Sequence, residues 1–264
     1  MKVYISADIE GITGVTHWDE AELDHPQHAA ARKQMLAEVM AAVDGALEAG
    51  AKEIWIKDAH STGRNIDISS FPKEVKIIRE WTCDPQSMMA LIDDSFDAAI
   101  FIGYHSGAGS GGNPLAHTMN GRNNWVKING EIAAEFDINA LIAASHGVPV
   151  VLLAGDARLC GHAEKKIPNI KTVATKEGIG DATVNIAPIY ACELIKQRTK
   201  EALTEKKPCL YPLPEKFDVQ IHFKHATHAY QASFYPGVRQ VEEHMVEFTV
   251  STVKDLIAAR MFIL

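Results

Sequence analysis

Short apolar runs alternate with segments of helical periodicity through the first two thirds of the chain, and this alternation restricts the fold more than any other feature of the sequence. Residues 3–7 form an apolar run that stops at acidic residues, residues 26–49 carry apolar side chains at helical spacing, and residues 53–57 form a second run. A proline near the start of the middle segment and Gly50 after its end are typical of a helix. Strand, helix and strand in this order favour two parallel strands joined by a right-handed crossover.

The same alternation continues as far as residue 166. Asn129-Gly130, between two short runs, is the strongest hairpin signal in the chain. Further strands are predicted at residues 75–78, 98–103 and 148–154, and further helices at residues 85–92, 134–145 and 157–166. The sequence therefore predicts an α/β fold, with a mostly parallel open sheet flanked by helices.

The periodicity weakens after about residue 175, and we place a boundary there. The C-terminal part is expected to contain a helix at 188–205, a Pro-rich connection at 206–216, strands near 219–223 and 244–250, and a final helix from residue 253. The expected division is an α/β core over residues 1–175 and a smaller α+β part over residues 176–264.

Composition and charge exclude several classes of protein. With 47% hydrophobic and 23% charged residues, the 264-residue chain has the composition of a folded globular protein. The net charge of -8 disfavours nucleic-acid binding, which normally needs a basic surface. The sequence has no run near the roughly 20 apolar residues of a membrane span and no signal-peptide core at its start. Four cysteines at irregular spacings suggest reduced thiols, so we expect a cytoplasmic location.

Three predicted strands end in side chains that can bind metal ions. Asp8 and Glu10 follow the first strand, Asp58 and His60 follow the second, and His105 follows the run at 98–103. Ligands of open α/β sheets bind beyond the carboxyl ends of the strands, so these ends converge if the strands are neighbours. Residues two apart on a strand share a face, so each pair can point to one place.

Carboxylates and imidazoles are typical zinc ligands, and one carboxylate can bridge two ions. With Glu135 added, the set is large enough for two metals. Each residue also has a structural interpretation: Asp8 or Glu10 as a cap, His105 as a hydrogen-bonded core histidine, and Asp58 as a partner that orients His60. Three strand ends with the same chemistry favour the metal site, because the structural roles would all have to coincide.

Other polar motifs allow weaker interpretations. Residues 107–112 match G-x-G-x-x-G, but Asn113-Pro114 follows where a phosphate-binding helix would have to begin, so we interpret them as a mobile loop beside the site. His117 lies just beyond and is a candidate proton carrier. Lys176 has two interpretations, a group that holds a substrate carboxylate or transition-state oxygen and, more commonly, a solvated side chain. His222, His225 and His228 are expected at the surface or the pocket rim, not at a third metal site.

Several motifs in one order resemble the bacterial D-aminopeptidase family of zinc metallopeptidases, of the dipeptide-transport-associated type. They are S-A-D-I-E-G-I-T-G at 6–14, K-D-A-H-S at 57–61, G-Y-H at 103–105, A-H-T-M at 116–119, N-G-E and A-E-F-D-I-N-A between 129 and 140, and A-G-D at 154–156. Together the motifs extend across most of the chain. The glycine-rich loop and the last quarter of the chain depart from the family pattern, which puts the substrate in doubt more than the metals.

The resemblance implies two zinc ions per chain, or another divalent metal, with one shared carboxylate. The bridge is Asp8, the further ligands of one ion are Glu10 and His60, and those of the other are His105 and Glu135. His117 matches the family's catalytic histidine. The resemblance also implies a large ring-like homo-oligomer, with the C-terminal part completing the pocket and the subunit contacts.

We therefore expect a binuclear zinc aminopeptidase that removes N-terminal residues from short peptides or amides, with D-amino acids implied by the resemblance. Two alternatives remain open: a binuclear phosphoesterase, because the same ligands serve phosphoryl chemistry, and a metal-dependent peptide-binding protein without catalysis. A dehydrogenase built on residues 107–112 is the weakest alternative. We expect neither a nucleic acid nor a membrane as partner.

Overall fold

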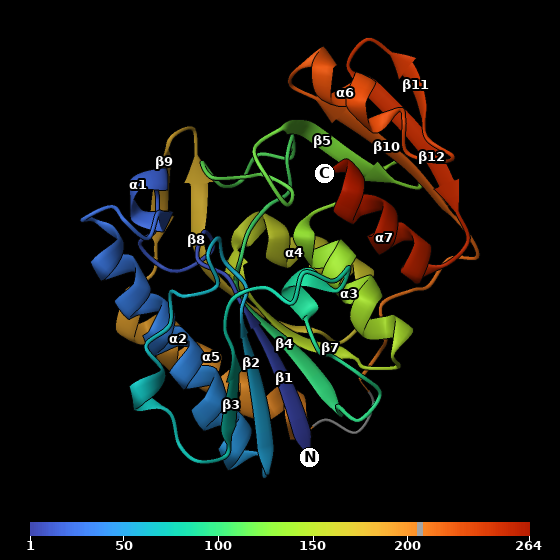
Figure 1. Cartoon of the computed structure of the whole chain (residues 1–264). Coiled ribbons are helices and arrows are strands. Elements are labelled where there is room, and N and C mark those ends of the chain that lie inside the picture. The colour runs from blue at the N-terminus through green and yellow to red at the C-terminus, as the bar shows by residue number, and fades with distance from the viewer. Residues whose placement is uncertain (205–207) are drawn as a thin grey trace.

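The computed structural model describes residues 1–204 and 208–264, which form two β-sheets with helices packed on and between them (Figure 1). The larger sheet has seven strands in the order β3-β2-β1-β4-β7-β8-β9. All its neighbouring strands are parallel except the β8–β9 pair. The predicted α/β fold with a mostly parallel sheet is confirmed. The strands are β1 (Lys2–Ala7), β2 (Glu53–Asp58), β3 (Val75–Ile78), β4 (Ala98–Tyr104), β7 (Val150–Asp156), β8 (Lys171–Ile179) and β9 (Ala182–Asn185).

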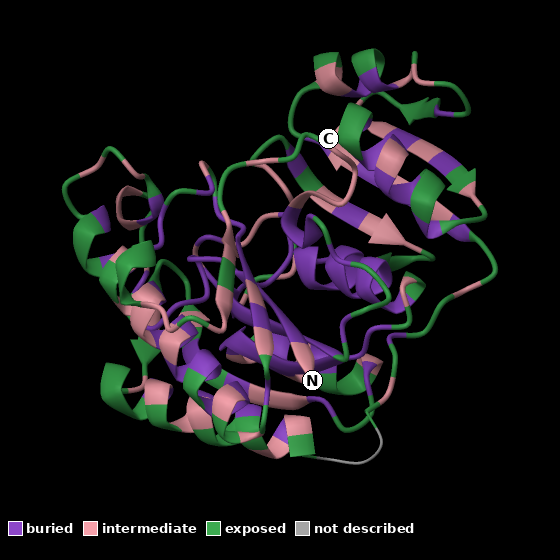
Figure 2. Ribbon diagram, turned by 60° about the horizontal axis from the view of Figure 1, so that its bottom comes forward, coloured by how far each residue is buried: buried purple, intermediate pink, exposed green. Residues whose placement is uncertain are grey.

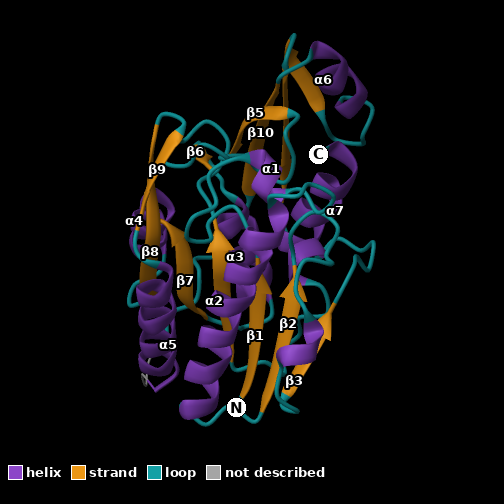
Figure 3. Cartoon of the chain, turned by 90° about the vertical axis from the view of Figure 1, so that its left-hand side faces the viewer, coloured by secondary structure: helices purple, strands orange, loops and turns teal. Residues whose placement is uncertain are grey.

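Helices cover both faces of this sheet because its strands are apolar on both sides. In β1, Val3 and Ile5 belong to a core with α2 (His28–Glu48) and α5 (Pro188–Thr204). Tyr4 points to the opposite face, into a core with α3 (Glu135–Ser145) and α4 (Ala157–Lys166). Figure 3 shows α2 and α5 side by side along one face of the strands. Such two-sided burial explains the continuous apolar runs of the sequence.

A second, antiparallel sheet lies beyond α3, in the order β11-β12-β10-β5-β6. It combines β5 (Asn123–Ile128) and β6 (Glu131–Ile132) with β10 (Phe217–Phe223), β11 (Arg239–Glu242) and β12 (Met245–Val250), and carries α6 (Ala226–Ala232) and α7 (Val253–Ile263). The hairpin predicted at Asn129-Gly130 joins β5 to β6, and both residues have positive φ angles. Since α3 packs between the two sheets, it is buried from Glu135 to Ala144 (Figure 2).

One predicted helix, at residues 85–92, is wrong. Only a single 3-10 turn, Ser87–Met89, forms there, and Ser87 and Leu91 have positive φ angles that a helix does not allow. The carbonyl oxygens of this segment bind the main sheet instead: Ser6 donates its hydroxyl to Met88 O (2.9 Å) and the Tyr4 hydroxyl donates to Ala90 O (2.8 Å). Tertiary hydrogen bonds therefore outweigh the local helical pattern.

The division at residue 175 stays a prediction, although β8 crosses that residue and the second sheet takes strands from both sides of it. The last residue of the helix predicted at 188–205, and residues 206 and 207 of the Pro-rich connection, lie outside the described residues. The four cysteines are free. Within the described ranges, no helix has the length and apolar character needed to cross a membrane.

Two glycines allow the chain after β1 to cross the end of β4. Gly11 donates its backbone N–H to Gly103 O (2.7 Å), and Asp8 donates to Ile102 O (2.8 Å). A Cβ atom on Gly103 would lie 2.1 Å from the carbonyl oxygen of Asp8, and Gly103 has a φ of +73°. The close backbone contact therefore requires glycine and fixes where Asp8 lies.

We predict that Gly103→Ala lowers the free energy of unfolding by about 3 kcal/mol or more, because left-handed strain and a backbone clash add together. Gly147→Ala is the matched control, since Gly147 has a φ of +74° and open space around its Cβ position. The control should lose only about 1–2 kcal/mol, the cost of the left-handed conformation alone. Urea denaturation measures both variants, and equal losses would contradict the role given to the close contact.

Candidate metal centre

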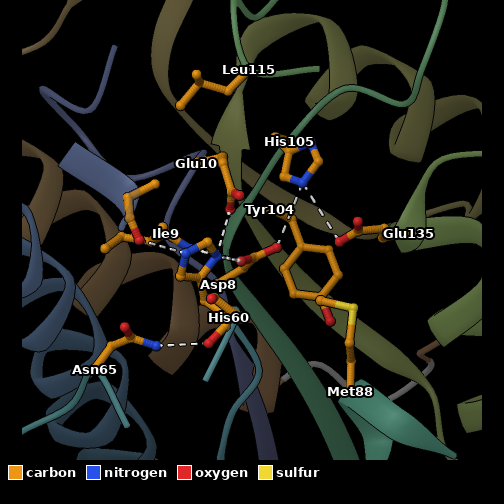
Figure 4. A network of polar contacts seen from close by, with 12 residues as sticks. Asp8, Ile9, Glu10, His60, Asn65, Met88, Tyr104, His105, Leu115 and Glu135 are labelled. Carbon is orange, nitrogen blue, oxygen red and sulfur yellow. Dashed lines mark hydrogen bonds and ion pairs between the residues drawn. The ribbon is translucent and has the colours of Figure 1, made fainter. Parts of the chain in front are cut away.

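The five predicted ligands converge at the carboxyl ends of three adjacent strands (Figure 4). The register pairs Ala7 of β1 with Asp58 of β2 and Ile102 of β4, so these strands end at nearly the same level. Strand order also reverses here, because the chain continues to β2 on one side of β1 and later to β4 on the other. Ligand sites of open α/β sheets lie at such reversal points.

Asp8 divides its two carboxylate oxygens between two groups of side chains. Its Oδ1 lies 3.2 Å from His60 Nδ1, which is also 3.1 Å from Glu10 Oε2. Its Oδ2 lies 3.7 Å from His105 Nε2, which is 3.5 Å from Glu135 Oε2. Each group thus supplies three potential ligand atoms within 4.8 Å of one another, and Asp8 belongs to both.

These separations fit ligands around metal ions. Two ligands of a tetrahedral zinc ion, each about 2.0–2.1 Å from the metal, are roughly 3.3 Å apart. The observed contacts of 3.1–3.7 Å scatter around that value, whereas direct charge-assisted hydrogen bonds are usually about 2.7–2.9 Å. Glu10 Oε2 and His105 Nε2 are also buried without a hydrogen-bond partner. Buried polar atoms normally have partners, so both atoms indicate a cation between the side chains.

Backbone carbonyls determine which nitrogen of each histidine is free to bind. A carbonyl oxygen only accepts, so the ring nitrogen next to it must carry the proton. His60 donates Nε2–H to Ala21 O (2.8 Å), and His105 donates Nδ1–H to Ser106 O (3.0 Å). The other nitrogen of each ring, Nδ1 of His60 and Nε2 of His105, faces the carboxylates and is available as a ligand.

Two further aspartates hold the loops that carry the histidines. Asp156 accepts hydrogen bonds from the backbone N–H (2.6 Å) and hydroxyl (2.7 Å) of Ser106, next to His105. Asp58, which the sequence suggested as a partner that orients His60, does not contact the imidazole ring. Asp58 instead accepts from the side chain of Asn65 (2.8 Å), which also donates to His60 O (2.8 Å), so it acts on the backbone of the loop.

The start of α3 places Glu135. Met119 donates its backbone N–H to Glu135 Oε1 (2.7 Å). The next turn is held by Asp137, which accepts from Ala134 N (2.8 Å) as a cap and from the Tyr211 hydroxyl (2.8 Å). His162 Nε2 lies 2.7 Å from the same carboxylate. Helix α3 is thereby attached to α4 and to the connection before β10, which fixes the helix that carries Glu135.

His117 lies beside the ligand cluster in a defined orientation. Its Nδ1–H donates to Leu115 O (2.9 Å), so Nε2 carries the lone pair, 3.4 Å from Glu135 Oε1. One neighbour of the His117 ring is His105, stacked at 4.4 Å between ring centroids, and another is Trp18, edge-on at 5.3 Å. His117 can therefore exchange a proton at Nε2. It also forms a third possible ligand group with Glu10 and His105.

A pocket of about 270 Å³ opens over the ligand cluster. Among the described residues that line it there is no lysine and no arginine. The lining consists of Asp8, Glu10, Trp18, Glu22, Ala59, His60, Ser61, Trp81, Met88, His117, Met119, Asn120, Gly121 and Glu135. The sequence analysis missed Trp18 and Glu22. They belong to the four-residue helix α1 (Trp18–Ala21) and its C-cap, and the local sequence signal for this helix is the capping pair His17 and Glu20.

Lys176 is neither solvated nor part of the pocket lining, so both sequence interpretations are wrong. It is 2% exposed and donates to the carbonyl oxygens of Glu10 and Val15. Burial lowers the pKa of Lys176 to about 8. Glu38 holds the same loop from α2, since it accepts from Thr13 N (3.0 Å). Lys176 therefore fixes the loop that carries Glu10.

The remaining candidates do not line the pocket. The glycine-rich loop connects His105 to His117, and no helix begins after it, so the structure lacks the feature that a dinucleotide site requires. His222 on β10 accepts from Asn124 Nδ2 (3.0 Å) and stacks on His244 at 5.9 Å. His225 and His228 pack edge-on to each other at 5.8 Å. Among the residues the structure describes, no possible ligand group includes these histidines.

The pKa shifts within the cluster indicate that its buried carboxylates favour positive charge beside them. Burial lowers the pKa of His105, but the negative charge of Glu135, whose Oε2 lies 3.5 Å from Nε2, outweighs burial and raises the pKa to about 10. Burial also opposes the charged form of His60, yet Glu10 and then Asp8 hold its pKa well above the usual range. Burial, followed by the charge of Glu10, raises the pKa of Asp8. Without a metal, protons therefore occupy positions that cations would take.

The whole chain is similar to known D-aminopeptidases. A sequence profile of the D-aminopeptidase family matches residues 1–262. The chain is 31% identical over 240 residues to the D-aminopeptidase of Bacillus subtilis (strain 168), covering 90% of this chain and 86% of that protein. A solved structure, the Zn-dependent D-aminopeptidase DppA from Bacillus subtilis, described as a self-compartmentalizing protease, matches with a TM-score of 0.92 at 29% identity. That match covers 100% of this chain and 96% of the other.

We predict that zinc binds more tightly as the pH rises from 6 to 8. Each histidine holds a proton in the metal-free cluster and must lose it to become a ligand, so every proton released strengthens binding about tenfold per pH unit. Calorimetric titration in buffers of different ionisation enthalpy measures both the affinity and the number of protons released. Zinc affinity that stays constant over this range, with no proton release, would contradict the assignment of His60 and His105.

Proposed function

Because the chain belongs to the D-aminopeptidase family, we propose that it is a binuclear zinc aminopeptidase that removes N-terminal residues, preferably D-amino acids, from short peptides or amides. The observation that carries the proposal is the division of the Asp8 carboxylate between two ligand groups. Glu10 and His60 would complete one zinc site, and His105 and Glu135 the other. The Zn-dependence of DppA supports zinc as the metal.

The chain's own side chains would position the reactants and move protons. Zinc at such a site, when bound, acidifies water and polarises a carbonyl group. His117 presents the lone pair of Nε2 towards the ligand cluster, because its Nδ1–H is held by Leu115 O. At that atom it can accept a proton and pass it to the leaving amine. Stacking on His105 and contact with Trp18 restrain the ring in this orientation.

The composition of the pocket lining favours a peptide or amide over a phosphoester. A phosphoester carries negative charge beyond the reacting phosphorus centre, and arginine or lysine usually binds that charge. The described lining residues include neither, whereas four of them are carboxylates. The volume of about 270 Å³ is near the lower end of ligand pockets, which suits one small amino-acid side chain.

Self-association is part of the proposal. DppA is described as self-compartmentalizing, and the present chain aligns with it over its full length. Three aromatic side chains on α6, α7 and the turn after α6 are unusually exposed: Tyr230 at 61%, Phe234 at 71% and Phe262 at 71%. Contiguous exposed apolar groups often mark protein interfaces. These observations support a ring-like homo-oligomer; the cytoplasmic location stays a prediction from the sequence.

The test compares zinc-loaded wild-type protein and His117→Ala on a D-amino-acid amide, a D-dipeptide and a phosphomonoester. The wild type should hydrolyse the amide and the dipeptide and leave the phosphoester intact. His117→Ala should keep its zinc and lose about 10²–10⁴-fold in kcat, the usual contribution of a proton-transfer group. Metal content is measured on the same samples.

Three results would contradict the proposal. Preferential cleavage of the phosphoester would favour a phosphoesterase, and binding of D-peptides without cleavage would favour a peptide-binding protein. Loss of zinc from His117→Ala would make His117 a metal ligand with Glu10 and His105 instead of the proton carrier.

A further inference from the structure

One carboxylate in the pocket has no assigned task. Four of the described lining residues are acidic, and three of them, Asp8, Glu10 and Glu135, are at most 3% exposed and belong to the ligand groups. The fourth, Glu22, is exposed and belongs to none of these groups. Glu22 is therefore the acidic side chain of this lining that remains available to a ligand.

Two hydrogen bonds fix the backbone of Glu22 beside the metal centre. Helix α1 ends at Ala21, which is fully buried and whose carbonyl oxygen accepts the Nε2–H of His60 (2.8 Å). Glu22 follows directly and donates its backbone N–H to Trp18 O (3.1 Å). The hydrogen bond from His60 to Ala21 therefore has two effects. It orients a proposed zinc ligand, and it places the next residue, Glu22, at the pocket rim.

The carboxylate of Glu22 is free of competing interactions. Within the described part of the chain, its side chain has no hydrogen bond and no ion pair. Asn120, an uncharged polar side chain of the same lining, is already engaged, since its Nδ2 donates to Leu264 O (2.6 Å) and its Oδ1 accepts from Arg122 N (2.8 Å). A free carboxylate in a pocket without lysine or arginine is suited to a cationic group.

We propose that Glu22 binds the α-ammonium group of the substrate's N-terminal residue, an assignment that rests on the proposed aminopeptidase function. An aminopeptidase must distinguish a free amine from an acylated one. The charges of Asp8, Glu10 and Glu135 are offset when cations are bound, and those cations repel an ammonium group. Among the described lining residues, Glu22 then carries the negative charge that is not offset, and this charge attracts the ammonium group.

Binding of the amine at a fixed position also selects the bond that is cleaved. The carbonyl group of the first residue follows the amine directly in a peptide, so an amine held at Glu22 presents that carbonyl to the neighbouring ligand cluster. A longer N-terminal segment would place later peptide bonds elsewhere. Glu22 would thereby restrict cleavage to one residue at a time.

The experiment measures the preference for a free amine in Glu22→Gln, which keeps the shape of the side chain and removes its charge. D-Alanyl p-nitroanilide is compared with propionyl p-nitroanilide, which lacks only the amine. Glu22→Gln should lower kcat/KM for the alanyl substrate about 10- to 100-fold, mainly through KM, because a charge-assisted hydrogen bond is lost. Its rate on the propionyl substrate and its zinc content should match the wild type.

Asp24→Asn is the matched control, because Asp24 is an exposed carboxylate two residues further on that does not line the pocket. It should retain the wild-type preference. An unchanged amine preference in Glu22→Gln, with the wild type active, would overturn the assignment and indicate that the metal ions hold the amine. A wild type that cleaves neither amide would overturn the proposed function itself, so the two failures are distinguishable.

Discussion

Three buried carboxylates, Asp8, Glu10 and Glu135, lie around two buried imidazoles at the carboxyl ends of the central strands of the main sheet. The structure depends on how the charge of these groups is neutralised. Burial of uncompensated charge costs several kcal/mol per group, so such a cluster needs protons or cations among its members. The contacts of 3.1–3.7 Å and the unpaired atoms of Glu10 and His105 favour cations. The rest of the fold supplies the rigidity that holds these groups close together.

That rigidity comes from the order of the strands. Residues 8, 60 and 105 are far apart in sequence, yet β1, β2 and β4 are adjacent and parallel, so their carboxyl ends meet. The fifth candidate ligand, Glu135, is positioned differently, by the start of α3, a helix buried between two sheets. Lys176, Asp156 and Asp58 then hold the connecting loops through backbone groups. Ligand geometry is thus set mostly by buried polar contacts to the main chain.

The sequence could predict the parts of this arrangement that have local signals. Apolar runs ending in Asp8, His60 and His105 indicated both the parallel sheet and the convergence of its ends. Glu135 and His117 end no predicted strand: the sequence made them candidates, and the resemblance to a family assigned Glu135 to one ion and matched His117 to a catalytic histidine. Long-range contacts cannot be recognised from local sequence patterns. The hydroxyl groups of Ser6 and Tyr4 donate hydrogen bonds to the carbonyl oxygens of residues 88 and 90, and these contacts replace a helix there. The pairing of β5 with β10, and the four-residue helix that brings Trp18 and Glu22 to the pocket, also depend on distant residues.

The most direct test of the shared-carboxylate arrangement is the zinc content per chain of the wild type and of Asp8→Ala after dialysis, measured by mass spectrometry of the metal, with circular dichroism to verify the fold. If Asp8 serves both sites, the wild type should hold about two zinc ions and the folded variant close to none. A folded variant that still holds two zinc ions, or a wild type that holds none, would contradict the account.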